Sequence, residues 1–122
     1  MNNPVISAVI IDDEIKGRET LKSLLEEFCE HVVVMDTFST IKAGVSGVKA
    51  LNPDVVFLDI SLPVEDGFQF FKYFENPSFE VVFVTAYTAY LDKAASYAAL
   101  DYLMKPVYIE DLKRIVQELK TR

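Results

Sequence analysis

The sequence has very few residues of the types that build disulfides, zinc sites or disordered chains. Its 122 residues include one cysteine, Cys29, and one histidine, His31. An internal disulfide and a zinc site made of several thiolates or imidazoles are therefore excluded, and this cysteine usage fits a reducing cytoplasm, where we expect the protein. Glycine and proline are also sparse, at 4 and 5 residues, whereas 51% of the residues are hydrophobic. That composition excludes a disordered or low-complexity chain.

Long hydrophobic runs and an excess of positive charge are also missing. The apolar runs are only a few residues long, well short of the roughly 20 residues that cross a bilayer. The first residues do not combine a basic segment with an apolar region, so we expect a protein that is neither membrane-bound nor exported. The formal net charge of -7 argues against direct contact with nucleic acid, because duplex binding depends on lysines and arginines that neutralise phosphates.

The length fits a single domain, and we expect residues 1–122 to form it, with a substantial core and no room for a second domain. Short apolar runs alternate with segments whose apolar residues recur at helical spacing. The runs are residues 9–11, 32–35, 55–58, 81–84 and 100–104. The helical segments are residues 21–28, 41–48, 68–74, 89–97 and 109–119. Strands that are apolar on both faces and separated by helices predict an α/β fold, in which helices cover both faces of a five-stranded parallel sheet.

Helical spacing also predicts which side chains of these segments are buried. Leu25 and Phe28 fall on one face of the first helix. Phe68, Phe71 and Phe74 fall on one face of the third helix. We expect both faces to pack against the sheet, since apolar stripes at this spacing face the core in globular proteins.

Four of the apolar runs end at residues that carry chemistry. Asp12 and Asp13 follow the first run, Asp59 the third and Lys105 the fifth, and Thr85 ends the fourth. The carboxyl ends of parallel strands share one edge of the sheet, and ligands bind outside that edge. We therefore expect these five side chains to meet there.

This set of residues suits a divalent cation and a phosphoryl group. Carboxylates that gather without a cation repel one another and partly protonate, and hard oxygen ligands favour Mg²⁺. Asp12 and Asp13 would hold the metal, while Asp59 would be a carboxylate nucleophile that accepts a phosphoryl group. The Lys105 ammonium and the Thr85 hydroxyl suit the phosphoryl oxygens. An alternative for the acidic run is an ordinary helix N-terminus, where carboxylates cap free amides.

Four segments resemble the receiver domain of two-component response regulators, over essentially the whole chain. They are VIIDDE, which ends at Glu14, FLDISLPVEDG, which ends at Gly67, VFVTAY, which ends at Tyr87, and DYLMKP, which ends at Pro106. Their order and spacing match the family. The resemblance implies a CheY-like, flavodoxin-like (βα)5 fold with strand order 2-1-3-4-5.

The resemblance also implies how the site would work. Asp59 would take phosphate from a histidine kinase or a phosphotransfer protein. Asp12, Asp13 and Asp59, together with the backbone carbonyl of Ser61, would bind Mg²⁺.

A switch is implied by the same resemblance. Thr85, Tyr102 and Lys105 would form it: Thr85 moves toward the phosphate, Tyr102 rotates inward, and the surface of the last helices changes. The Lys105–Pro106 bond is expected to be cis. Taken alone, Thr85 would be a turn or cap residue and Tyr102 an ordinary strand aromatic.

The segment from Thr85 to Pro106 is most similar to receivers that are fused to LytTR-type DNA-binding domains. The sequence differs from that subgroup at Ala95 and Val107, where aromatic residues are usual. An output domain of this type, absent from the 122 residues, would carry the response. In related receivers the fourth helix, the fifth strand and the fifth helix form dimers, and a homodimer through these elements is expected here.

Two rival functions fit parts of the pattern. A Mg²⁺-dependent phosphohydrolase of the haloacid-dehalogenase type also uses an aspartyl nucleophile, but such enzymes usually have an Asp-x-Asp motif after the first strand and a cap insertion, and the sequence has neither. A pseudo-receiver that binds partners without phosphorylation is disfavoured by the intact acidic set. We expect a protein that is not an enzyme, beyond promoting the gain and loss of its own phosphate.

Overall fold

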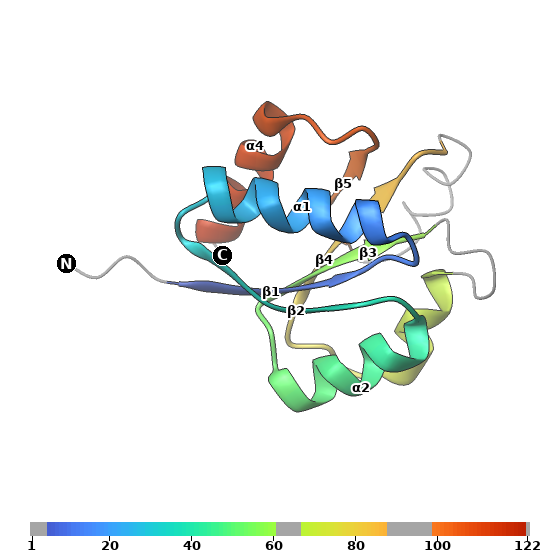
Figure 1. Ribbon diagram of the computed structural model, residues 1–122. Coiled ribbons are helices and arrows are strands. Elements are labelled where there is room, and N and C mark those ends of the chain that lie inside the picture. Colours follow the sequence, from blue (N-terminus) through green and yellow to red (C-terminus); the bar gives the residue numbers. More distant parts are fainter. Residues whose placement is uncertain (1–4, 61–66, 88–98, 122) are drawn as a thin grey trace.

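The computed structural model describes residues 5–60, 67–87 and 99–121 (Figure 1). Ser61 and the helix expected over residues 89–97 lie outside these ranges. Within them, every helix is too short or too polar to traverse a bilayer. The elements are β1 (Ile6–Ile11), α1 (Ile15–Phe28), β2 (Val32–Phe38), α2 (Ile41–Leu51), β3 (Val55–Asp59), the 3-10 helix η1 (Gly67–Tyr73), β4 (Glu80–Thr85), β5 (Asp101–Met104) and α4 (Ile109–Lys120).

The five strands form one sheet in the order β2-β1-β3-β4-β5, and every neighbouring pair is parallel. The expected fold class and strand order are therefore confirmed. Helices α1 and α4 cover one face of the sheet, and α2 and η1 cover the other (Figure 1). The chain leaves β1 toward β2 and later returns to β3 on the other side of β1, so the loops after β1 and β3 diverge at the edge where ligands bind in such sheets.

Strand β3 lies at the centre of both cores. All five of its residues are buried. Because successive strand side chains point to opposite faces, Val55 and Phe57 join the core beneath α1 and α4, whereas Val56 and Leu58 join the core beneath α2 and η1. This packing from both sides fixes the position of Asp59, the last residue of the strand.

The end of α1 differs from the sequence-based expectation. Leu25 is fully buried as predicted, but the Phe28 side chain is 38% exposed. Phe28 is the last residue of α1, so the helix ends before its ring can reach the core. The ring instead lies near α4, with the Lys113 ammonium 5.9 Å from the ring centroid.

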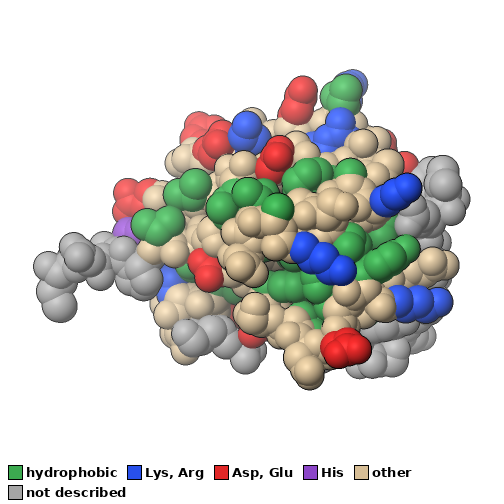
Figure 2. Space-filling view, turned by 90° about the horizontal axis from the view of Figure 1, so that it is seen from below, with side chains coloured by type: hydrophobic (Ala, Val, Ile, Leu, Met, Phe, Trp, Pro, Cys, Tyr) green, Lys and Arg blue, Asp and Glu red, His purple; other side chains and the backbone are tan. Residues whose placement is uncertain are grey.

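Helix η1 also differs from the expectation, because it is a 3-10 helix. A 3-10 helix has about 3.0 residues per turn in place of about 3.6, so the three-residue spacing of Phe68, Phe71 and Phe74 would place them on one face of this helix as well. Phe68 is buried as predicted, Phe71 and Phe74 are only partly buried, and Phe70, which the spacing left out, is completely buried. Apolar side chains remain visible between the polar ones on this side of the molecule (Figure 2).

Phe70 is the centre of an aromatic cluster. Its ring centroid lies 4.9 Å from that of Phe74, 5.8 Å from that of Phe79 and 5.9 Å from that of Phe71. We expect Phe70→Ala to lower the free energy of unfolding by about 3–5 kcal/mol, because it removes these contacts and leaves a cavity. Urea denaturation would measure the change. Gln69→Ala, at the exposed neighbouring position, should change stability by about 0.5 kcal/mol or less, and equal losses in the two variants would contradict this packing.

Candidate functional site

Four acidic residues meet at the carboxyl edge of the sheet. Asp12 follows β1 and Asp59 ends β3, and these strands are paired neighbours in which Ile11 lies beside Leu58. One carboxylate oxygen from each of Asp12, Asp13, Glu14 and Asp59 lies within 4.8 Å of the others. The side chains of Asp12 and Asp59 are buried, with exposed fractions of 4% and 1%. The sequence did not assign Glu14 to the site, although this residue directly follows Asp12 and Asp13 in the acidic run.

Lys105 reaches this cluster from the end of β5. Its ammonium donates hydrogen bonds to Asp12 Oδ2 at 2.9 Å and to Asp59 Oδ2 at 3.1 Å. Glu14 Oε1 is 3.9 Å from the same ammonium. The Lys105–Pro106 peptide bond is cis. A single cation therefore bridges two buried carboxylates that come from different strands.

The pKa values show that one lysine does not balance this negative charge. Burial, with a contribution from the nearby Asp59 carboxylate, raises the pKa of Asp12 to about 6, although bonds from Lys105 and from the Glu14 amide oppose the rise. Burial and the charge of Asp59 also raise the pKa of Asp13. Burial alone would lower the pKa of Lys105, but its bonds to Asp12 and Asp59 outweigh that effect and raise the pKa.

The donor set fits a hard divalent cation. The four converging residues offer only carboxylate oxygens, which are the ligands that Mg²⁺ prefers, usually together with water. A cation at these oxygens would favour the charged form of each carboxylate and so oppose the rise in the pKa of Asp12. The Ser61 carbonyl, expected to be a further ligand, lies outside the described residues.

The other two of the three expected switch residues, Thr85 and Tyr102, differ in their burial. Thr85 ends β4 and is completely buried. Its hydroxyl accepts the Tyr87 N–H at 3.0 Å, and its carbonyl accepts the Lys105 N–H at 2.7 Å. Tyr102 lies in β5 beside Phe83 and is 42% exposed. Thr85 is thus tied to the backbone of Lys105, whereas Tyr102 is directed outward.

Backbone and glycine contacts that the sequence analysis did not assign also shape the site. The Arg18 guanidinium donates to the carbonyl of Asp12 at 2.7 Å. A Cβ at Gly67 would lie 2.7 Å from Ile60 Cα and 2.8 Å from the Asp59 carbonyl oxygen. Only glycine allows η1 to approach so closely behind Asp59. The sequence did not indicate this role of Gly67, since a close backbone approach leaves no signal of its own in a single sequence.

Comparison with known proteins identifies the family. The family described as response regulator receiver domain matches residues 8–117. A response regulatory protein of Vibrio cholerae is 41% identical over 116 residues, which are 94% of this chain and 48% of that protein. Sensory transduction protein LytT of Bacillus cereus is 37% identical over 119 residues, which are 95% of this chain and 46% of that protein. The chain thus spans about half the length of these curated relatives.

Solved structures agree with this result. The REC domain of AraT, a response regulator from Geobacillus stearothermophilus, superposes with a TM-score of 0.83 at 26% identity, covering 96% of this chain and 94% of that one. A CheY-like response regulator receiver domain from Methylobacillus flagellatus gives 0.80 at 25% identity, covering 94% and 98%. The family match, the relatives and the fold lead to one conclusion: the chain belongs to the receiver domains of two-component response regulators.

Proposed function

We propose that Asp59 is the phosphoacceptor of this receiver domain. The observation that carries the proposal is the position of its carboxylate, which is buried at a strand end, lies within reach of three other carboxylates and is hydrogen-bonded to Lys105. Asp12, Asp13, Asp59 and the Ser61 carbonyl would hold Mg²⁺. Bound there, the metal would neutralise the charge of the incoming phosphoryl group.

The phosphoryl group comes from a phosphohistidine of a sensor kinase or a phosphotransfer protein. An Asp59 oxygen forms a bond to phosphorus while the phosphorus–nitrogen bond breaks and its electron pair returns to the imidazole. Lys105 already lies 3.1 Å from Asp59 Oδ2, so its ammonium needs only a small movement to pair with a phosphoryl oxygen. Water later attacks phosphorus and restores the carboxylate. We propose that the domain itself promotes both the gain and the loss of phosphate, without being an enzyme toward other substrates.

The response begins at Thr85 and continues through Tyr102. The Thr85 hydroxyl already accepts the Tyr87 N–H, and it can donate its own proton to a phosphoryl oxygen on Asp59. Its movement leaves space that Tyr102, now half-exposed, rotates inward to fill. New charge-assisted hydrogen bonds supply the free energy for this shift.

The change would then be transmitted through β5 and α4. Asp101, the neighbour of Tyr102, accepts a hydrogen bond of 2.6 Å from Arg114 of α4. A homodimer would use this surface together with the helix expected over residues 89–97, which lies outside the described residues. The relative named LytT supports a LytTR-type output domain in a longer regulator. We propose that this regulator is cytoplasmic and that the output domain, in place of this one, contacts DNA.

The phosphoacceptor assignment can be tested by intact mass spectrometry. With acetyl phosphate and Mg²⁺, the wild-type chain should gain one phosphoryl group, and omission of Mg²⁺ should prevent the gain. Asp59→Asn should gain none, because the amide is not a nucleophile, whereas Asp36→Asn, at an exposed position on β2, should react like the wild type. Absence of phosphoryl addition to the wild type, or equal addition to Asp59→Asn, would refute the assignment.

The role of Lys105 can be separated from metal binding. Lys105→Gln should slow phosphorylation by acetyl phosphate about tenfold or more, since loss of a charge-assisted bond worth about 1.4 kcal/mol in the transition state has that effect. Mg²⁺ affinity, measured by isothermal titration calorimetry, should not fall, because the lysine competes with the metal for Asp12. Lys42→Gln, on the exposed side of α2, is the matched control. Weaker Mg²⁺ binding with unchanged phosphorylation would exclude this role.

The role of Tyr102 predicts a variant that accepts phosphate and does not report it. Tyr102→Ala should be phosphorylated like the wild type, because its side chain lies outside the acidic cluster. Phosphorylation should no longer shift the amide NMR signals of β5 and α4. Tyr108→Ala, which removes a 62% exposed ring next to α4, should leave those shifts unchanged. Shifts of wild-type size in Tyr102→Ala would rule out the aromatic step.

A further inference from the structure

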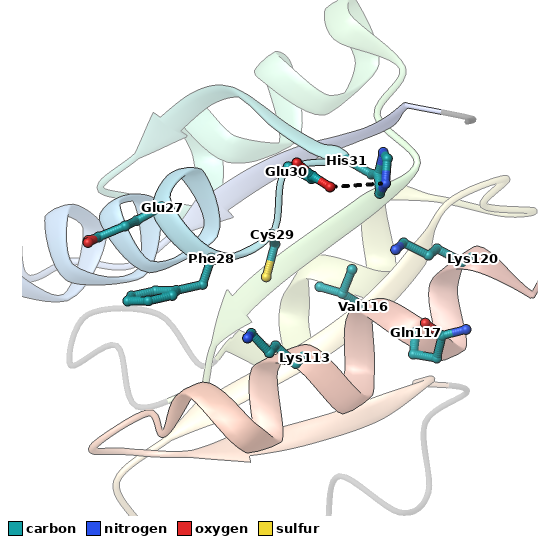
Figure 3. A pocket seen from close by; sticks show the side chains of 9 residues that line it. All are labelled: Glu27, Phe28, Cys29, Glu30, His31, Lys113, Val116, Gln117 and Lys120. Atoms are coloured by element: carbon teal, nitrogen blue, oxygen red, sulfur yellow. Dashed lines mark ion pairs between the residues drawn. The ribbon is translucent and has the colours of Figure 1, made fainter. Parts of the chain in front are cut away.

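A cavity lies at the end of the molecule opposite Asp59. It is enclosed by the end of α1, by the connection from α1 to β2, and by one face of α4 (Figure 3). Its volume is about 310 Å³, which is within the range of clefts that bind small molecules. The proposed phosphorylation at Asp59 makes no use of this cavity.

Three apolar side chains, those of Phe28, Cys29 and Val116, line the cavity beside six polar or charged ones. Cys29 and Val116 are each 5% exposed, and the Phe28 ring lies at the rim. Burial raises the pKa of the Cys29 thiol, so this side chain is uncharged near neutral pH and acts as a small apolar group. The exposed Phe28 ring, which the sequence had placed in the core, forms one wall of this cavity.

Two lysines add positive charge from α4. Lys113 and Lys120 are seven residues apart, so they lie on the same side of the helix, one on each side of Val116. Among the described residues, no carboxylate forms an ion pair with either ammonium. Both charges oppose the rise in the pKa of Cys29, which shows that their positive potential reaches the inner surface of the cavity. An anion bound between them could pair with both lysines.

Two acidic residues limit how much negative charge the cavity accepts. Glu30 lies 3.8 Å from His31 (dashed line in Figure 3), and Glu27 is also part of the lining. These carboxylates would repel a nucleic acid or another polyanion, since like charges in close proximity are unfavourable. A ligand with one anionic group can pair with the two lysines, and it meets less repulsion from Glu27 and Glu30 than a polyanion does.

We propose that this cavity binds a small molecule that carries a single anionic group on an aromatic or short aliphatic body. The apolar body lies against Cys29, Val116 and the Phe28 ring. The anionic group, a carboxylate or a sulfonate, lies between Lys113 and Lys120. Apolar contact and charge pairing thus act on opposite parts of one ligand, as in other small-molecule sites.

A pair of fluorescent probes tests both parts of this proposal. 8-Anilinonaphthalene-1-sulfonate has an aromatic body with one negative charge, and N-phenyl-1-naphthylamine has the same body without the charge. The unphosphorylated wild-type chain should bind one molecule of the sulfonate, as followed by its fluorescence, and should bind the uncharged amine at least about tenfold more weakly, a ratio that corresponds to about 1.4 kcal/mol. Equal affinities for the two probes would overturn the proposal.

Variants of the two lysines locate the site. Lys113→Gln/Lys120→Gln should bind the sulfonate at least about tenfold more weakly, whereas Lys113→Arg/Lys120→Arg keeps the charge and should retain binding. Lys22→Gln/Lys42→Gln removes the same charge from exposed positions on α1 and α2 and should bind like the wild type. Wild-type affinity in the first variant, or an equal loss in the last, would refute the cavity as the site.

Cys29 provides an independent measurement because it is the only thiol in the sequence. Saturating sulfonate probe should slow the alkylation of Cys29 by N-ethylmaleimide in the wild type and leave the rate unchanged in Lys113→Gln/Lys120→Gln. Equal protection in both proteins, or none in the wild type, would refute the proposal. Neither measurement uses Mg²⁺ or a phosphodonor, so the result does not depend on the role of Asp59.

Discussion

The buried negative charge at the carboxyl edge of the sheet is the constraint on which the rest of the site depends. Burial raises the pKa of Asp12 to about 6, and the Lys105 ammonium opposes this rise while it bonds directly to both Asp12 and Asp59. The fold tolerates the arrangement because each of the three residues follows or ends a different strand of a rigid sheet. Carboxylates that meet in this way fit the proposed Mg²⁺, which would add the positive charge that one lysine does not supply.

Much of this site could be predicted because its residues follow short apolar runs, which are easily recognised in the sequence. Asp12, Asp59 and Lys105 each stand where a buried run stops, and a parallel sheet brings such positions to one edge. The sequence could not show that Lys105 would bridge Asp12 as well as Asp59, since 93 residues separate Lys105 from Asp12. Nor could it show the approach of Gly67 to the backbone of Asp59, which depends on the path of η1 and not on a side-chain pattern.

The errors in the fold prediction have local physical causes. Phe28 fits the apolar spacing of α1, but spacing does not show that the helix ends at that residue and leaves the ring outside the core. Phe70 lies off the three-residue spacing of the other rings, and its burial reflects the cluster that it forms with Phe71, Phe74 and Phe79, which spacing within one segment does not predict. Strands β1 to β5 were predicted correctly, since their apolar runs lie in a sheet buried on both faces.

Strand β3 has a mechanical consequence. Its side chains are packed alternately into two cores that lie on opposite faces of the sheet. A force on Asp59 therefore acts against side chains that are tightly packed on both faces of the sheet, and close-packed interiors deform little. The strand therefore stays in place, and any displacement occurs in segments of the chain that are packed on one side only. In the proposed switch, this stiffness at Asp59 would direct the response to phosphorylation toward the surface of the molecule instead of into its core.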